Sequence, residues 1–349
     1  MTDAVLRVER TPGWLRDAKF DGGFIVGIAG IALASGAVVV AFPKLFPLIL
    51  LLDLWLLGYH HVISTYTRLA FDRASFEQHK FLLLYLPFIV FGATFAVAAG
   101  AGLWALASIY LYWQWFHYTR QSWGVSQMYK RKAGSLAGEP DWFAQAAFYA
   151  LPIWGILYRS YQDPGTFLGL ELKVVPVPGV VVEAAGVLAL SMVALWAVTR
   201  VRLWLRGELP MAHTLYWLSH MTVFSVGYLL IEDITFGWLV INVWHNMQYI
   251  AFVWLYNTKR FEGGVSDSAP YLSRLSQPQN WKRYFLVCFA ISSLAYGAIE
   301  IVGGQLGLIA IPLIVIYQAI NFHHYLVDGV IWKSKKNKVQ RDLSHSEAA

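Results

Sequence analysis

Histidines inside apolar stretches are the residues of this sequence with the clearest capacity for chemistry. A neutral imidazole binds transition metals, and it gains or loses a proton near neutral pH. The chain has ten histidines. Those that fall within long hydrophobic blocks are His60, His61, His117, His213, His220, His245, His323 and His324. Because ionisable residues are costly in a bilayer, we expect these histidines to face the protein interior and to be functional.

Polar side chains accompany these histidines at helical spacing. Asn246 and Gln248 closely follow His245, and they are amides that can hold a water or an imidazole. Asp328 lies four residues after His324. Residues four apart share a helix face, so one of this pair can orient the other. We therefore expect Asn246, Gln248 and Asp328 to be catalytic residues that orient water or the metal ligands.

Adjacent histidines cannot easily face one metal together, because successive helical residues point about 100° apart. The expected ligands of one metal are therefore one residue of each adjacent pair and two single histidines: His60 or His61, His117, His245, and His323 or His324. His213 and His220 are seven residues apart on one helix face, and could complete a second metal position. For any one buried histidine, a hydrogen bond between helices is the simpler role.

The donor types narrow the choice of metal. Neutral imidazole suits zinc, copper, iron and nickel, and the single cysteine, Cys288, excludes a multi-cysteine site within one chain. Non-haem iron is favoured because a site of histidines, with or without a carboxylate, leaves open positions for oxygen. Copper is the next choice. Haem is the remaining alternative, held by two histidines on facing helices such as His60 or His61 with His245.

Long apolar blocks predict the helices that position these residues. The chain is 57% hydrophobic and 14% charged, whereas soluble domains carry about 25% charged residues. A spanning helix needs about 20 mostly apolar residues. Such blocks are Phe24–Phe42, Phe46–Tyr66, Phe81–Gly100, Leu103–Tyr118, Phe143–Tyr158, Val177–Val198, Leu215–Ile231, Phe236–Tyr256, Tyr284–Val302 and Leu306–Trp332. The sequence thus predicts an all-α, polytopic transmembrane bundle of about ten spanning helices.

Charge in the connecting segments predicts the orientation. Lys and Arg are frequent at both ends of the chain and after the second, fourth, sixth and eighth blocks, whereas the other connections contain only Lys44, Arg159 and Lys173. Such an excess marks the cytoplasmic side. We predict a cytoplasmic segment at 1–21, a transmembrane domain at 22–333 and a basic cytoplasmic tail at 334–349, in a bacterial inner (plasma) membrane. The net charge of +6 is then explained without a nucleic-acid partner.

Four segments in chain order carry a resemblance to a known family. They are Gly58–His61, Phe116–Tyr118, Trp244–Tyr249 and Phe322–Asp328. They resemble the His-containing helices of the Brp/Blh family of membrane β-carotene dioxygenases, in which intramembrane histidines surround one iron. The chain departs from that pattern at Tyr249, where a second histidine would be expected, and it lacks the family's Pro-His-Gly start. The resemblance implies a histidine-ligated iron oxygenase but not the carotenoid substrate.

These features predict an integral membrane non-haem iron oxygenase. The orientation places the eight histidines between the bilayer middle and its cytoplasmic face, where a lipid-like or other apolar substrate can enter between helices. An electron donor is a candidate partner. A transporter of metal ions or protons is one alternative, although the outer halves of the histidine-bearing helices carry few ionisable groups apart from Asp53. A haem-binding electron-transfer protein is the other.

Overall fold

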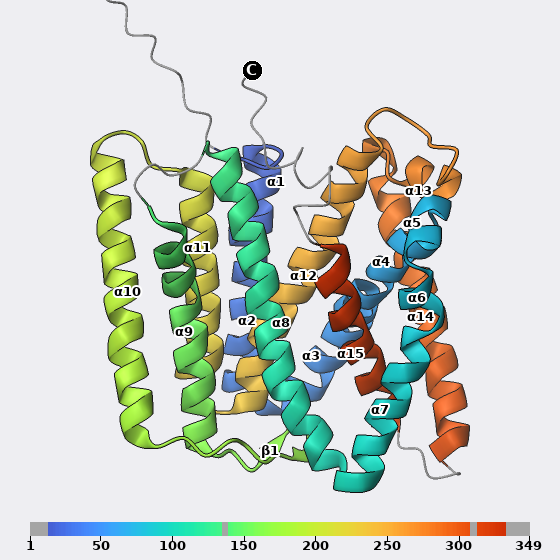
Figure 1. Ribbon diagram of the computed structural model, residues 1–349, viewed down its shortest axis with the longest axis horizontal. Coiled ribbons are helices and arrows are strands. Elements are labelled where there is room, and N and C mark those ends of the chain that lie inside the picture. The colour runs from blue at the N-terminus through green and yellow to red at the C-terminus, as the bar shows by residue number, and fades with distance from the viewer. Residues whose placement is uncertain (1–12, 135–138, 308–312, 333–349) are drawn as a thin grey trace, which may run out of the picture.

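The computed structural model describes residues 13–134, 139–307 and 313–332, and over these residues the chain is almost entirely helical. The predicted all-α class is confirmed. Figure 1 shows the long helices side by side in one bundle, with their ends gathered at two opposite faces. One short hairpin, formed by β1 (Thr166–Phe167) and β2 (Leu170–Glu171), lies at one of these faces.

The helices have the following bounds. The α-helices are α1 (Ala18–Gly22), α2 (Ile28–Ala41), α3 (Phe46–Leu52), α4 (Tyr59–Ala70), α5 (Arg73–Gln78), α6 (Lys80–Leu84), α7 (Leu86–Ala101), α8 (Leu103–Lys132), α9 (Asp141–Gln162), α10 (Gly179–Leu205), α11 (Met211–Ser225), α12 (Ile234–Arg260), α13 (Pro270–Leu275), α14 (Trp281–Gly307) and α15 (Leu313–Ile331). The π-helical turns are η1 (Gly23–Gly27), η3 (Asp53–Gly58) and η4 (Val226–Leu230). The 3₁₀ turns are η2 (Pro43–Leu45) and η5 (Pro278–Asn280).

The helices differ from the predicted blocks mainly at their ends. The first helix begins at Ala18, where Asp17 caps it, and therefore inside the segment 1–21. Helix α8 continues to Lys132, well beyond its apolar block. Helix α14 continues to Gly307 through the predicted turn at 303–305, so the last block is divided between α14 and α15. The predicted tail at 334–349 lies outside the described residues.

Within the described ranges, four helical segments are long and apolar enough to cross a membrane, which is compatible with a membrane protein. They are Ala18–Ala41, Pro43–Ala70, Gly179–Leu205 and Pro278–Val302, and Leu86–Ala101 is a shorter apolar helix. Helices α8 and α12 carry buried polar residues such as Gln114 and Asn242. Their polarity faces the bundle interior, as expected for polar residues in a membrane protein.

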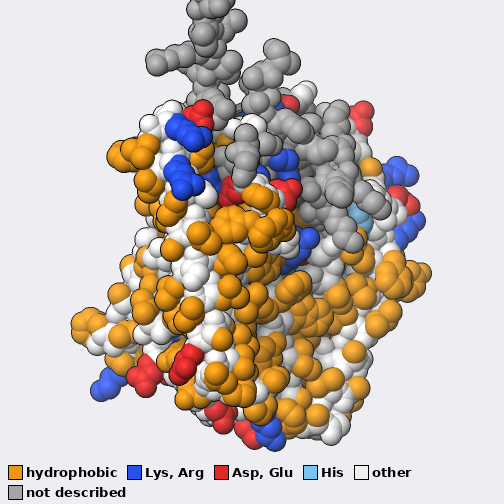
Figure 2. All heavy atoms as spheres, turned by 60° about the vertical axis from the view of Figure 1, so that its left-hand side comes forward, with side chains coloured by type: hydrophobic (Ala, Val, Ile, Leu, Met, Phe, Trp, Pro, Cys, Tyr) orange, Lys and Arg blue, Asp and Glu red, His pale blue; other side chains and the backbone are white. Residues whose placement is uncertain are grey.

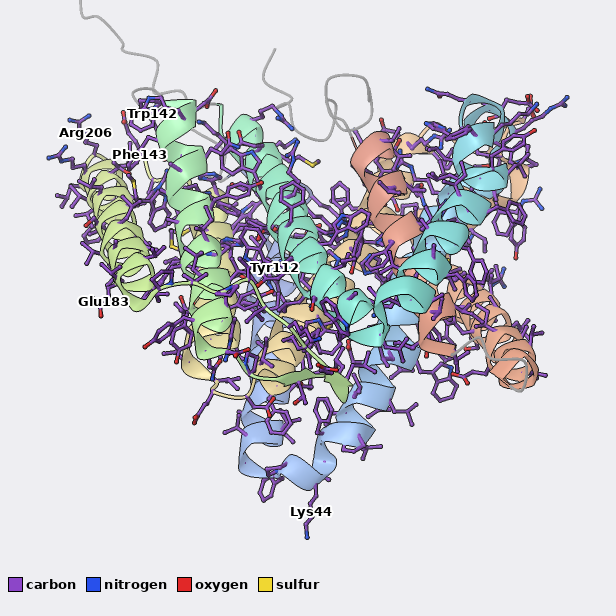
Figure 3. All side chains as sticks on the ribbon, turned by 60° about the horizontal axis from the view of Figure 1, so that its bottom comes forward. Lys44, Tyr112, Trp142, Phe143, Glu183 and Arg206 are labelled. Atoms are coloured by element: carbon purple, nitrogen blue, oxygen red, sulfur yellow. The ribbon has the colours of Figure 1, made fainter. Side chains whose placement is uncertain are left out.

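The surface is apolar along the flank of the bundle and charged at its two ends. Figure 2 shows hydrophobic side chains covering the flank, with Lys, Arg, Asp and Glu concentrated above and below. Large apolar residues such as Phe88 (78% exposed) and Leu294 (75% exposed) point outward. In Figure 3, Lys44 and Arg206 lie at different extremities of the molecule. Apolar surface on this scale indicates contact with lipid or another apolar partner.

Helix α12 is the central helix, and it packs closely against the π turn η4. A Cβ added at Gly237 would lie 2.0 Å from the carbonyl oxygen of Gly227, so the two backbones touch there. The buried Arg159 of α9 fastens this junction, because its guanidinium donates to the carbonyl oxygens of Gly227 at 3.0 Å and Glu232 at 2.6 Å. These bonds satisfy carbonyls left free at the end of a helix. The depth of α12 in the bundle thus depends on two glycines and one arginine.

Gly237→Ala should destabilise the protein strongly. The added methyl meets backbone rather than a movable side chain, so the cost should reach or exceed the ~1–3 kcal/mol typical of overpacked sites. Thermal unfolding in detergent should show a clearly lower midpoint. Gly30→Ala is the matched control, since no heavy atom lies within 4 Å of its added Cβ. Equal midpoints for the two variants would contradict the close approach.

Candidate metal centre

Four helices bring buried imidazoles and one carboxylate to a common point. His61 comes from α4, His117 from α8, His245 from α12, and His324 with Asp328 from α15. The π turn η3 directly precedes α4, and a π turn adds a residue to the helical turn, which changes the face on which later residues lie. This local geometry turns His61 toward the other three helices.

The donor atoms of this cluster are close enough for one metal ion. One ligand atom each from His61, His117, His324 and Asp328 lies within 4.8 Å of the others, and all four residues are buried. The ring of His245 is their neighbour, with its centroid 4.7 Å from that of His61 and 5.1 Å from that of His117. Three imidazoles and one carboxylate are therefore the candidate ligands of one metal ion, and a fourth imidazole, that of His245, lies beside them.

A hydrogen-bond chain sets the tautomer of His61. The buried carboxylate of Asp53 accepts from the amide nitrogens of Asn242 at 2.5 Å and Asn246 at 3.3 Å. Because Asn246 gives its amide N–H to Asp53, its carbonyl oxygen faces Nδ1 of His61 at 2.7 Å. An amide oxygen only accepts, so Nδ1 of His61 carries the proton. The other nitrogen, Nε2, is left with a lone pair.

A second series of hydrogen bonds sets the tautomer of His324. The Tyr249 hydroxyl donates to Oδ1 of Asp328 at 2.8 Å and also bonds to the Thr65 hydroxyl. Thr65 gives its single proton to Tyr249 or to Asp328, so its oxygen accepts from Nδ1 of His324, 3.2 Å away. Nε2 of His324 is therefore also left with a lone pair.

The two lone pairs face each other, and this contact is favourable only with a positive charge between the nitrogens, either a metal ion or a shared proton. Nε2 of His61 and Nε2 of His324 are 2.7 Å apart, and Oδ2 of Asp328 is 3.5 Å from the latter. Oδ2 of Asp328 and Nε2 of His117 and His245 are buried without a hydrogen-bond partner. Buried polar atoms are normally satisfied, and each exception needs an explanation. A metal ion would satisfy the atoms of His61, His117, His324 and Asp328 together, so the residues present fit a metal.

The other histidines of the two adjacent pairs face elsewhere. The ring of His60 meets the edge of Phe285 on α14, with centroids 5.8 Å apart. His323 lies between the Tyr66 hydroxyl, 2.6 Å from Nδ1, and the carbonyl oxygen of Leu82, 2.7 Å from Nε2. Each pair therefore contributes one residue to the cluster, as the helical geometry predicts.

The pair on α11 and one of the expected amides lie apart from the cluster. His213 faces Ser126 of α8 at 3.3 Å. His220 has both ring nitrogens engaged, Nδ1 with Ser122 at 3.0 Å and Nε2 with the Phe148 carbonyl at 3.2 Å. The oxygen of Gln248 accepts from the Tyr216 hydroxyl at 3.1 Å. These residues join helices, whereas Asn246 and Asp328 belong to the cluster.

Thr65 and Tyr249 are parts of the site that the sequence reasoning missed. Each lies four residues after a histidine of the cluster, His61 on α4 and His245 on α12, so the i,i+4 spacing could have pointed to them. The ring of Tyr249 also stacks on that of His61, with centroids 4.2 Å apart. Asp53 was visible as an ionisable residue, but its link through Asn246 depends on tertiary packing.

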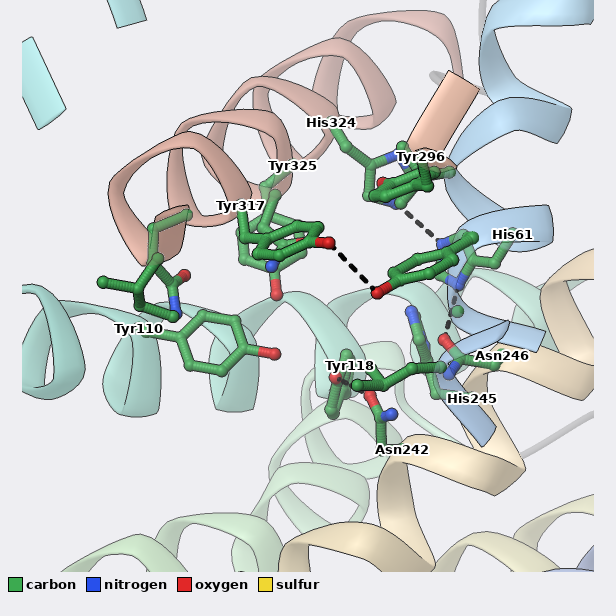
Figure 4. Close-up of a pocket in the computed structure, with 17 residues that line it drawn as sticks. His61, Tyr110, Tyr118, Asn242, His245, Asn246, Tyr296, Tyr317, His324 and Tyr325 are labelled. Atoms are coloured by element: carbon green, nitrogen blue, oxygen red, sulfur yellow. Dashed lines mark hydrogen bonds between the residues drawn. The ribbon is translucent and has the colours of Figure 1, made fainter. Parts of the chain in front are cut away.

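A cavity adjoins the cluster on one side. Its volume is about 160 Å³, and His61, His245 and His324 form part of its wall. Figure 4 shows these three residues at one end, with Tyr110 and Tyr317 toward the other. A small molecule in this cavity would contact the donor residues directly.

Comparison with known proteins gives no match, whether to family models, to curated proteins or to solved structures. The chemistry of the site therefore rests on its own geometry.

Asn246→Ala should weaken metal binding by about 10–100-fold, the usual effect of removing a partner that orients a metal-binding histidine. Metal affinity measured by competition with a chelator would report it. Asn257→Ala is the matched control: it is also a buried asparagine of α12, but it donates to Tyr284 at 3.0 Å. Equal losses in the two variants would mean that the amide acts only on the fold.

Proposed function

We propose that this chain is a polytopic integral membrane protein with about ten spanning helices and both termini in the cytoplasm. The apolar flank and the four long apolar helices support the membrane location. The sidedness rests on Lys and Arg. In Figure 1 the C-terminal ends of α8, α10 and α12 lie at the face that also holds α1, and these ends carry Lys130, Arg202 and Lys259. An excess of basic residues marks the inner side.

Within that framework, we propose a metal-dependent oxidoreductase, with non-haem iron as the metal and oxygenation of an apolar substrate as the reaction. The observation that carries the proposal is the pair of facing lone pairs on His61 and His324, beside the unpartnered atoms of His117 and Asp328. Imidazole and carboxylate ligands with open positions are typical of non-haem iron oxygenases. The resemblance of four histidine-bearing segments to the Brp/Blh family points the same way.

Each residue of the site would have a distinct task. His61, His117, His324 and Asp328 would hold the iron, and bound iron would supply redox chemistry with dioxygen. Asn246 and Thr65 fix the two imidazole tautomers, which keeps Nε2 of His61 and of His324 available. The Tyr249 hydroxyl, which donates to Asp328, can exchange a proton with that carboxylate during a reaction. Burial of the cluster excludes bulk water.

The alternatives fit this geometry less well. The ring centroid of His61 lies 4.7 Å from that of His245 and 4.5 Å from that of His324, a spacing that leaves no room for a porphyrin between them. A transporter would need ionisable groups that continue the path from the cluster. Asp53 lies in the predicted outer half of the second apolar helix and could continue such a path. Its carboxylate is already hydrogen-bonded to two asparagines. We therefore propose iron as the metal of this site, with copper as the second choice.

Purified protein should contain a single tightly bound metal ion per chain, and it should be iron. His324→Ala and His117→Ala should each lose most of it, because each removes one of few ligands. His213→Ala should keep it, since His213 is an equally buried histidine that faces Ser126. Elemental analysis of wild type and variants provides the measurement.

Three outcomes would contradict this assignment. They are wild-type protein with no metal above background, equal metal loss in all three variants, and a Soret band in the visible spectrum. The first would remove the metal centre, the second would point to general unfolding, and the third would assign haem instead of iron.

Single cysteines should report the topology. In a Cys288→Ser background, Lys44→Cys should react in intact cells with a maleimide that does not cross membranes, because Lys44 is exposed in the predicted outer turn. Glu262→Cys, exposed after α12, should react only after the cells are permeabilised. The reverse pattern would invert the proposed orientation.

A further inference from the structure

Tyrosine is the commonest residue in the walls of the cavity beside the cluster. Six tyrosines line it, from α4, α8, α14 and α15: Tyr59, Tyr110, Tyr118, Tyr296, Tyr317 and Tyr325. A site for hydrocarbon alone would use Leu, Ile or Phe at these positions. Tyrosine combines an aromatic face with a hydroxyl that seeks a hydrogen-bond partner. The wall therefore favours a ligand that is both flat and oxygenated.

Stacked rings form one side of the cavity. Tyr59 lies flat on Tyr296 with centroids 3.7 Å apart, and Tyr317 lies beside this pair, 5.9 Å from Tyr296 and 6.0 Å from Tyr59. The interplanar angles are 7° and 11°. Parallel faces at this spacing form a flat wall, against which an aromatic ring packs in an offset stack.

The volume limits what can enter. The cavity measures about 160 Å³, close to the ~150 Å³ of an engineered apolar cavity that binds benzene. One six-membered ring with a few attached atoms fills such a space, and an extended chain does not. Any longer part of the ligand must lie outside the cavity, between helices or in the lipid.

Polar atoms in the cavity need a partner with oxygen. Oε1 of Gln318, a residue only 4% exposed, is buried without a hydrogen bond. The Tyr59 hydroxyl reaches that of Tyr317 only at 3.4 Å, longer than the roughly 2.5–3.0 Å of a good O–H···O bond. The Tyr317 proton is already given to Glu300. A ligand hydroxyl could donate to Gln318 and accept from Tyr59, which would satisfy both.

We propose that this cavity binds the ring of a phenol or quinol, with its oxygen toward Gln318 and Tyr59 and an edge toward His61 and His324. A hydrocarbon ring would leave the buried amide oxygen unpaired, which is expensive in an apolar setting. That this ring is the substrate rests on the proposed function. That it binds here rests only on the cavity.

Binding of two matched probes to the full-length protein in detergent tests the proposal. 4-Ethylphenol and ethylbenzene have nearly the same shape and differ by one hydroxyl. Equilibrium dialysis, corrected with protein-free micelles, should give at least tenfold tighter binding of the phenol. The preference arises because the site's polar atoms stay unpaired with the hydrocarbon. Equal binding of the two probes, or no binding of either, would overturn the proposal.

Variants locate the binding and guard against a misfolded protein. Gln318→Leu should reduce the preference for the phenol to threefold or less while ethylbenzene binds as before. Val62→Trp should abolish binding of both probes, because Val62 is a wall residue and the larger ring fills the cavity. Gln127→Leu, which replaces a glutamine of α8 that also has a buried unpaired atom but does not line the cavity, should change neither. A Gln127→Leu effect equal to that of Gln318→Leu would overturn the assignment.

Two further measurements complete the test. One distinguishes a phenolic lipid from a free phenol as the ligand, and the other distinguishes failure of the ring site from failure of the proposed function. A 4-dodecylphenol that binds much more tightly than 4-ethylphenol would identify a lipid with a phenolic end group, and equal affinity would identify a free phenol; either supports the ring site. Phenol binding by protein that contains no metal would refute the proposed function and leave this site standing. Metal-loaded protein that binds neither phenol would refute the site alone.

Discussion

Two imidazole nitrogens that both carry lone pairs lie 2.7 Å apart between α4 and α15, and this contact is the constraint on which the site depends. The contact is repulsive unless a positive charge lies between the two nitrogens. Nε2 of His117 and Oδ2 of Asp328, which lie nearby without a hydrogen-bond partner, are also atoms that can bind a cation. Hydrogen bonds to the Nδ1 atom of each imidazole impose this arrangement. Asn246, held by Asp53, faces one Nδ1, and Thr65, held by Tyr249 and Asp328, faces the other. The helices supply the position, and the hydrogen bonds supply the protonation state.

The same logic explains why so polar a layer is stable inside an apolar bundle. A buried polar group costs free energy unless it is paired, and here each amide, hydroxyl and carboxylate behind the imidazoles has a partner. Helix α12 makes this possible because it lies deep in the bundle and presents Asn242, His245 and Asn246 inward. Its depth in turn depends on the contact of Gly237 with Gly227. A metal centre at one level of the bundle is thus coupled to backbone packing at another.

The sequence predicted the all-α fold, because long apolar blocks leave few other structures in a bilayer. It also predicted that one residue of each adjacent histidine pair would join the cluster, and that His324 and Asp328 would share a face. It could not choose His61 over His60, because the π turn at Asp53–Gly58 changes the helical face and leaves no plain sequence signal. His213 and His220 looked equivalent to the others. Their serine and carbonyl partners come from α8 and α9 and are fixed only by tertiary packing.

Anomalous diffraction from crystals of the purified protein, collected on both sides of the iron absorption edge, would test the metal centre most directly. A single strong peak should lie within bonding distance of Nε2 of His61 and His324, with His117 and Asp328 as its other protein neighbours. A map with no anomalous peak there, in which these donor atoms contact only one another or water, would contradict the metal centre.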